Sequence, residues 1–262
     1  MDRASGVARS EWTKFRSVRS TMWPLAVTVL VTIAIGVLAT ATAATRFTDG
    51  TAADRLTFDP TSLSLTGLFL GQLAIGVLGV LVMSGEYGSG TIRSTFAAVP
   101  NRPLVLAAKA AVFAGVTLVV GEVLSFAAFF IGQAPLAASV PHASLGEPGV
   151  LRAVAGSGLY LALLGLLALG LGLATITRHT AGSITAFVGV MFILPLLSAA
   201  LPSSIRTGFE KYLPSDIGSA MMSVRTARGA SQLSPWVGLA VLLAHVTATL
   251  GVGAWLLVRR DA

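Results

Sequence analysis

Residues 153–177, AVAGSGLYLALLGLLALGLGLATIT, contain no charged side chain. A helix that crosses a lipid bilayer needs about 20 mostly apolar residues, so this stretch alone is long enough to span a membrane. Backbone groups without hydrogen-bond partners are too costly in lipid for an irregular segment to cross it. We therefore predict that residues 153–177 cross a membrane as a helix.

The whole chain has the composition of a polytopic membrane protein. Of its 262 residues, 54% are hydrophobic and 11% are charged, against about a quarter charged in an ordinary soluble domain. This composition excludes a soluble enzyme and a disordered chain. The chain contains no cysteine, which removes disulfides and thiolate chemistry. Its three histidines, His142, His179 and His245, lie far apart without metal-ligand spacing, so we predict no metal site.

Five further stretches match the length and composition of a spanning helix. The alternating pattern of a membrane β-barrel does not occur, so we predict an all-α membrane protein with one transmembrane domain over residues 1–262. The first apolar run is longer than the 7–15 residues of a signal-peptide core, and we expect it to be retained. The predicted spans are residues 23–44, 63–84, 104–132, 153–177, 181–201 and 235–258.

The net charge of +7 fits membrane topology better than nucleic-acid binding, because the basic residues are scattered between apolar runs. Most of them fall on one side of the predicted membrane. We therefore predict a multi-pass protein of the cell (plasma) membrane with both termini in the cytoplasm. The predicted cytoplasmic side carries Arg3, Arg9, Lys14, Arg16, Arg19, Arg93, Arg102, Lys109, Arg178, Arg259 and Arg260; the outer side carries Arg46, Arg55, Arg152, Arg206, Lys211, Arg225 and Arg228.

The first 22 residues have the pattern of an amphipathic helix that lies in the membrane interface. Apolar residues recur every three or four positions and share one face, while basic residues reach water or lipid headgroups. Such a helix serves either as a topology anchor or as a mechanical part. The apolar residues are Trp12, Phe15, Val18 and Met22, and the basic residues are Arg9, Lys14, Arg16 and Arg19.

The loop between the second and third spans, SGEYGSGTIRSTFAAVPNRP at residues 84–103, predicts a short helix of its own. Ser89 or Thr91 can cap its start, and Pro100 ends it. Ile92, Phe96 and Val99 follow a helical spacing and give it one apolar face. We expect a protein partner to bury this face, with self-packing on the membrane surface as the alternative.

These residues resemble the ABC type-2 transporter permease family, in particular the actinobacterial stand-alone six-span permeases. The resemblance rests on EYGSGTIR at residues 86–93, VPNR at residues 99–102 and Lys109, supported by EWTKFRSVRST at residues 11–21 and YLPS at residues 212–215. It implies a permease dimer, homomeric or heteromeric, above two cytoplasmic ATPase subunits, and a re-entrant helical pair before the last span. The N-terminal helix would also touch the ATPase. The implied coupling residues are Glu86, Gly90, Thr91, Ile92, Arg93, Phe96 and Val99.

The chain itself has no ATP-binding motif. A phosphate loop requires G-x-x-x-x-G-K-[ST], and none of the three lysines follows a glycine. We therefore expect a transport subunit of an ABC exporter without catalytic residues or a cofactor of its own. ATP and Mg²⁺ would bind the separate ATPase chain. The apolar, small-residue interior favours a hydrophobic or amphipathic cargo.

Two charged residues flank the predicted coupling helix. We expect Glu86 to contact the ATPase or to hold the helix through Arg93, with a solvated carboxylate as the alternative. Lys109 lies one turn into the third span, and we expect it either to extend its ammonium to the interface or to have a mechanical role.

Two ionisable residues lie deep in the predicted membrane region. Glu122 and His245 each fall about 15 Å below the outer surface at a rise of 1.5 Å per residue. Charges inside a membrane indicate function by default, and we name both residues as candidates for the substrate pathway. The alternative for Glu122 is a neutral carboxyl group hydrogen-bonded to Ser125 or Thr117.

Two other functions remain open. An ATPase-independent secondary transporter would relay protons through Glu122 and His245. An intramembrane serine protease would pair Ser157 with His245, although it would require a glycine at Ala155 and an oxyanion residue that the second span lacks. Between the fifth and sixth spans, apolar patches on either side of Pro214 predict two short external helices.

Overall fold

The structure, a computed structural model, describes residues 3–17, 19–51, 55, 58–136, 140–174, 180–224 and 232–259. Within these ranges it does not describe the side chains at positions 3, 4, 16–25, 27 and 174. The following residues of the sequence analysis therefore lie outside the description: Arg3, Arg16, Val18, Arg19, Met22, Arg178, His179, Arg225, Arg228 and Arg260.

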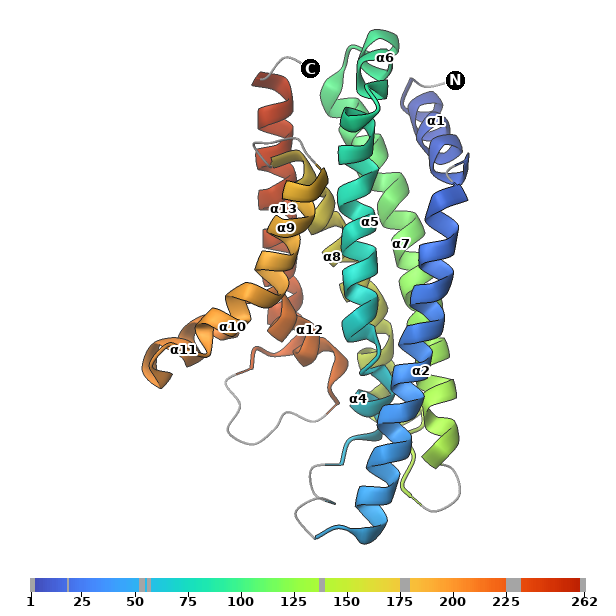
Figure 1. The fold of residues 1–262 in the computed structure, drawn as a ribbon, viewed down its shortest axis with the longest axis vertical. Coiled ribbons are helices and arrows are strands. Elements are labelled where there is room, and N and C mark those ends of the chain that lie inside the picture. The colour runs from blue at the N-terminus through green and yellow to red at the C-terminus, as the bar shows by residue number, and fades with distance from the viewer. Residues whose placement is uncertain are drawn as a thin grey trace.

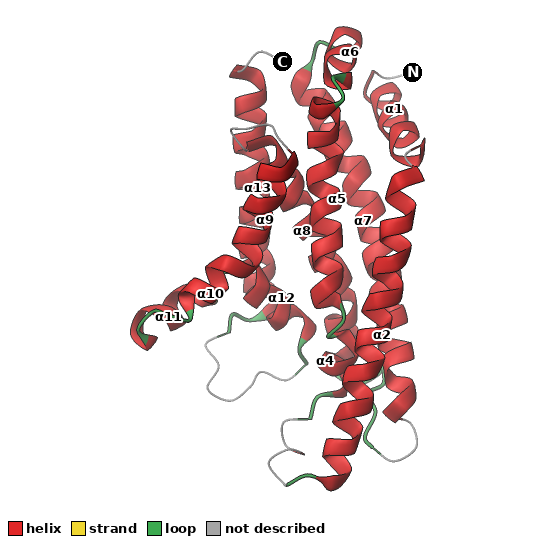
Figure 2. Cartoon of the chain, viewed as in Figure 1, coloured by secondary structure: helices red, strands yellow, loops and turns green. Residues whose placement is uncertain are grey.

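The described residues form helices and loops and contain no strand (Figure 2). Six helical runs are long and apolar enough to cross a membrane, so the prediction of an all-α chain with six such helices is confirmed. Each run overlaps one predicted span. They are Thr28–Asp49, Pro60–Gly88, Arg102–Leu136, Val150–Leu173, Thr180–Ser198 and Pro235–Arg259.

The helices follow one another along the chain as α1 (Arg3–Ser17), α2 (Arg19–Asp49), α4 (Pro60–Leu65), α5 (Leu68–Gly88), α6 (Thr91–Ala98), α7 (Arg102–Gln133), η1 (Ala134–Leu136), α8 (Val150–Ala174), α9 (Thr180–Val188), η2 (Gly189–Ile193), α10 (Leu194–Ser198), α11 (Ser203–Glu210), α12 (Pro214–Met222) and α13 (Pro235–Arg259). Both termini and α6 lie at the same end of the bundle (Figure 1). An even number of spans produces this arrangement.

Helix α8, which contains most of the uncharged stretch at residues 153–177, lies at the centre of the bundle. It packs against α5, α7 and α13, and 72% of its most apolar stretch is buried, against 17% in Thr28–Asp49 and in Thr180–Ser198. Tyr160, Leu161 and Leu164 are completely buried. A helix that is apolar on all sides is expected in such a position.

The fifth apolar run bends away from the bundle. Residues Gly189–Ile193 form a π-helical turn, and Pro195 follows in the first turn of α10. Both features interrupt regular helical hydrogen bonding and are common causes of kinks. As a result α10 and α11 project from the side of the molecule (Figure 1).

The two predicted external helices correspond to α11 and α12, which meet near Pro214. No residue of α11 is buried. Helix α12 instead packs between α8 and α13 and buries Ile217 and Met221. Only the second of the two helices therefore belongs to the core.

Helix α1 packs on α7 through a face that differs from the predicted one. Val7 and Glu11 are buried, and Phe15 lies with its ring centroid 6.4 Å from that of Phe113. Trp12, which was expected on the same apolar face as Phe15, is 50% exposed. The side of α1 that packs on the bundle therefore includes Glu11, whose buried ion pair an apolar pattern does not reveal.

Candidate functional site

Helix α6 forms the tip of the connection between two spanning helices (Figure 1). Gly90 separates α5 from α6 with φ of 73°, a conformation that glycine adopts without steric cost. After α6, the side chain of Asn101 accepts a hydrogen bond from the backbone N–H of Leu104 and caps α7. Short, stiff connections therefore attach α6 to both spans.

The apolar face of α6 packs on the chain's own helices. Ile92 is 2% exposed and lies in a cluster with Leu106, Phe113 and Leu257. Phe96 packs against the same cluster, and the Arg102 guanidinium lies 5.3 Å from its ring centroid. The bundle end therefore supplies apolar surface that the sequence alone did not reveal, and the burial of Ile92 needs no protein partner.

Val99 packs on the other side of the same end, where Val7 and Val105 meet. Arg102 also donates a hydrogen bond to the carbonyl of Leu257, with a distance of 2.8 Å. These contacts connect the end of α6 and the start of α7 to both terminal helices of the chain.

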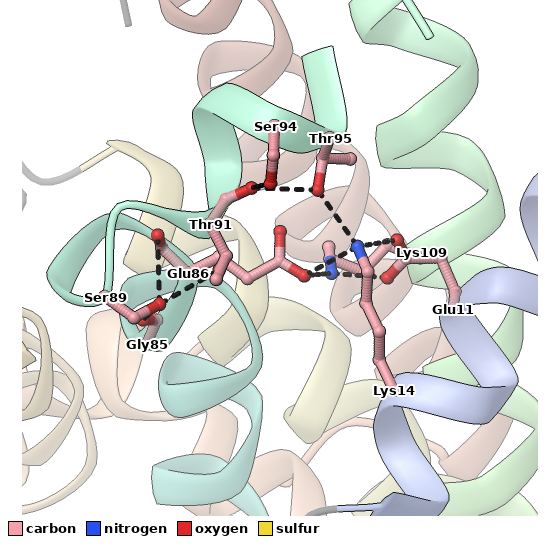
Figure 3. A network of polar contacts seen from close by, with 9 residues as sticks. All are labelled: Glu11, Lys14, Gly85, Glu86, Ser89, Thr91, Ser94, Thr95 and Lys109. Atoms are coloured by element: carbon pink, nitrogen blue, oxygen red, sulfur yellow. Dashed lines mark hydrogen bonds and ion pairs between the residues drawn. The ribbon is translucent and has the colours of Figure 1, made fainter. Parts of the chain in front are cut away.

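Next to this packing lies a cluster of four charged side chains, Glu11, Lys14, Glu86 and Lys109 (Figure 3), which we call the ion cluster. Lys109 Nζ lies 2.8 Å from Glu86 Oε1 and also pairs closely with Glu11. Lys14 Nζ lies 2.7 Å from Glu11 Oε1 and 3.1 Å from Glu86 Oε1. It also donates to Thr95 Oγ1 of α6, at 3.1 Å. The ion cluster thus joins α1, α5, α6 and α7.

The ion cluster contains two carboxylates and two ammonium groups, so its formal charge balances. The side chains of Lys109 and Glu11 are each 4% exposed, whereas that of Lys14 is 37% exposed. Burying an isolated charge is very costly, and pairing offsets that cost. Burial alone would lower the pKa of Lys14, but hydrogen bonds and charge from Glu11 and Glu86 raise it overall. Lys14 therefore carries its charge at neutral pH.

Two predictions about these charges differ from the structure. Lys109 does not extend to the interface, because Glu11 and Glu86 hold its ammonium group inside the bundle. Glu86 pairs with the two lysines and forms no ion pair with Arg93 among the described residues. Sequence reasoning missed Glu11 altogether, since it read this residue only as part of a motif.

The exposed surface of α6 is its polar side, made of Thr91, Arg93, Ser94, Ala97 and Ala98. Of the expected coupling residues, Gly90, Thr91 and Arg93 are exposed, whereas Ile92, Phe96 and Val99 face the bundle. A molecule that touches this end of the protein would meet the first group. Ile92, Phe96 and Val99 instead fix the position of α6.

The structure does not bring Glu122 and His245 together. Glu122 lies in the wall of a cavity between α7, α8, α12 and α13, and His245 is not among the residues that line it. No hydrogen bond or ion pair joins the two among the described side chains. The expected partners of Glu122 are also engaged elsewhere, because Ser125 lies 2.9 Å from Ser157 and Thr117 donates to the carbonyl of Phe113.

Ser157, the residue considered for a protease, is completely buried. Its hydroxyl lies within hydrogen-bonding distance of Ser125 and of the carbonyls of Ala153 and Val154. These contacts are those of a structural polar group in a helix interface.

In comparisons with known proteins, no protein-family model matches this chain and no curated protein matches it.

Proposed function

We propose that the chain is the permease subunit of an ATP-driven exporter that works with a separate ATPase chain. The observation that carries this proposal is the placement of α6, a short helix between two spans, held by the ion cluster and exposed only along its polar side. The resemblance to ABC type-2 permeases supplies the partner, the direction of transport and the dimeric assembly.

The ion cluster suits α6 to transmit force. Helix α6 continues into α5 and α7 along the chain, and Thr95 and Lys14 connect it to α1. Separating paired charges inside a protein leaves them unpaired and costs about 3–5 kcal/mol. A push on α6 would pass along the chain to α5 and α7, and the ion pairs of Lys109 with Glu11 and Glu86 would keep α1, α5 and α7 together.

The contact surface in this proposal is the polar side of α6. Arg93 places a positive charge on this side, and the small side chain of Ala97 is exposed there. We expect an acidic or polar groove of the ATPase to receive them, in the cytoplasm, on the side where the basic residues of the chain predominate.

Affinity purification of the tagged chain from its native membrane tests the proposal. We expect a soluble ATPase to purify with it, with ATP hydrolysis in the purified fraction. Arg93→Glu and Ala97→Glu should each reduce the amount of ATPase without lowering the amount of permease. Arg206→Glu, the same charge change on α11 away from the α6 end, is the matched control and should change nothing.

A chain that purifies without any ATPase from gently solubilised membrane would contradict the proposal. Equal losses with Arg93→Glu and Arg206→Glu would contradict the placement of the contact on α6.

A further inference from the structure

A second feature, remote from the ion cluster, is the cavity beside Glu122. Its volume is about 550 Å³, within the range of roughly 300–1,000 Å³ typical of small-molecule sites. It lies between α7, α8, α12 and α13, near the first residues of α8 and α13. Most of its wall is apolar, with Leu118, Leu151, Ala155, Leu159, Trp236 and Leu239 among its residues.

Glu122 and Arg152 are the two ionisable residues in this wall. The guanidinium of Arg152 is engaged at the end of α12, where it donates to the carbonyl of Ser223 at 2.7 Å and to that of Met221 at 3.3 Å. The helix dipole also favours a positive charge at the carbonyl end of a helix, where the Arg152 guanidinium lies. Arg152 therefore serves the fold and offers little to an anion in the cavity.

Glu122, in contrast, makes no hydrogen bond or ion pair with any described residue. Its position depends on Gly158 of α8. A Cβ atom at Gly158 would lie 2.6 Å from Glu122 Cδ and 2.8 Å from Glu122 Cα, closer than atoms can approach. The absence of a side chain at Gly158 thus lets α7 pack directly on α8. The Glu122 side chain lies against Gly158 and forms part of the cavity wall.

An unpaired carboxylate in an apolar wall is complementary to a cation with a bulky apolar body. The apolar residues would bury that body, and a matching positive charge would offset the cost of holding a partly buried carboxylate in an apolar wall. The indole of Trp236 can add a cation–π contact. Val119 and Val123, which follow the wall residues Leu118 and Glu122 along α7, are 64% and 65% exposed, so the cavity borders a surface suited to lipid.

We propose that this cavity binds lipophilic monocations and that Glu122 supplies the counter-charge. Its role as a site for exported cargo rests on the proposed permease function, whereas binding itself needs no ATPase.

Direct binding to the purified chain in phosphatidylcholine nanodiscs tests the proposal. Tetraphenylphosphonium and tetraphenylborate serve as probes, because they have nearly the same shape and opposite charge. We expect saturable binding of the phosphonium at least tenfold tighter than that of the borate. Glu122→Gln, which keeps the shape and removes the charge, should weaken phosphonium binding by about 10–100-fold, the loss expected for an interaction with a charged group.

Two further variants keep the test informative. Glu147→Gln makes the same chemical change at an exposed position outside the cavity and should leave binding unchanged. Ala155→Phe places a ring in the cavity and should abolish binding of both ions. If the borate binds as tightly as the phosphonium, or if Glu122→Gln binds the phosphonium like the parent chain, the proposal is wrong. Either result would leave the ATPase co-purification untouched, so the two proposals fail separately.

Discussion

Glu86 lies near the end of α5 and Glu122 lies within α7. Both are carboxylates of apolar helices, yet their surroundings are opposite. Glu86 lies between Lys14 and Lys109 in the ion cluster, whereas Glu122 lies in a cavity wall without a partner among the described residues. A paired charge holds helices together, and an unpaired one is a cost to the fold unless a ligand meets it. This difference underlies our two proposals, a mechanical role for the ion cluster and a binding role for the cavity.

The largest expected effect on stability comes from replacing Lys109, which pairs with both carboxylates of the ion cluster. Lys109→Met leaves Glu11 and Glu86 buried with only the half-exposed Lys14, and we expect a loss of about 3–5 kcal/mol in the free energy of unfolding. Reversible denaturation in detergent micelles measures this loss. The double variant Glu11→Gln with Lys109→Met should lose less than the sum of the two single changes; a strictly additive loss would show that the two residues do not interact.

A second change acts at the other carboxylate. Gly158→Ala places a methyl group against the backbone of Glu122, and we expect a loss of about 1–3 kcal/mol, as in other overpacked interiors. Gly115→Ala on α7 is the control, because a methyl group there meets nothing within 4 Å. The control should be neutral or gain up to about 1 kcal/mol from helix propensity. Equal effects at the two glycines would contradict the close contact of α7 and α8.

Lys14 should matter less than Lys109, because it is more exposed. Water screens its ion pairs, and we expect Lys14→Met to cost no more than about 1 kcal/mol. Its raised pKa also fixes the sign of a pH effect. The contribution of Lys14 is complete below the ordinary lysine pKa of 10.5 and falls as the pH rises through the raised value. Thermal unfolding of the parent chain and of Lys14→Met should therefore converge at strongly alkaline pH; a constant difference across the pH range would exclude this role.

The smallest expected effect on stability is at Arg93. Its side chain is exposed and outside the ion cluster, so Arg93→Glu should change the free energy of unfolding by less than about 0.5 kcal/mol. The same unfolding assay measures it. A large loss would show that Arg93 supports the fold, and any accompanying loss of ATPase would then no longer identify a contact.

Sequence reasoning found the features that depend on local pattern. Apolar stretches of spanning length located the six apolar helices. Pro100 indicated where α6 ends. Helical spacing also grouped Ile92, Phe96 and Val99 on one face, although it did not show that the chain buries that face itself.

Features that join distant parts of the chain were not predictable in the same way. The pair of Glu11 with Lys109 connects residues 98 positions apart, and no local pattern specifies which helix α1 packs against. Likewise, the cavity depends on a hydrogen bond from the Arg152 guanidinium to the carbonyl of Ser223, which follows α12 and lies 71 positions later in the chain. The place of Glu122 within a long apolar helix was predictable from the sequence, whereas its lack of a partner among the described residues required the packed structure.

The most direct test of the coupling role of α6 is photo-crosslinking in the native membrane. A photoreactive amino acid at Ala97, on the exposed side of α6, should crosslink the chain to a soluble ATPase, and the same residue at the exposed Ser204 of α11 should not. This result would place the ATPase on α6. A chain that reaches the membrane in normal amounts and gives no ATPase crosslink from Ala97, or gives the same crosslink from Ser204, would contradict the account.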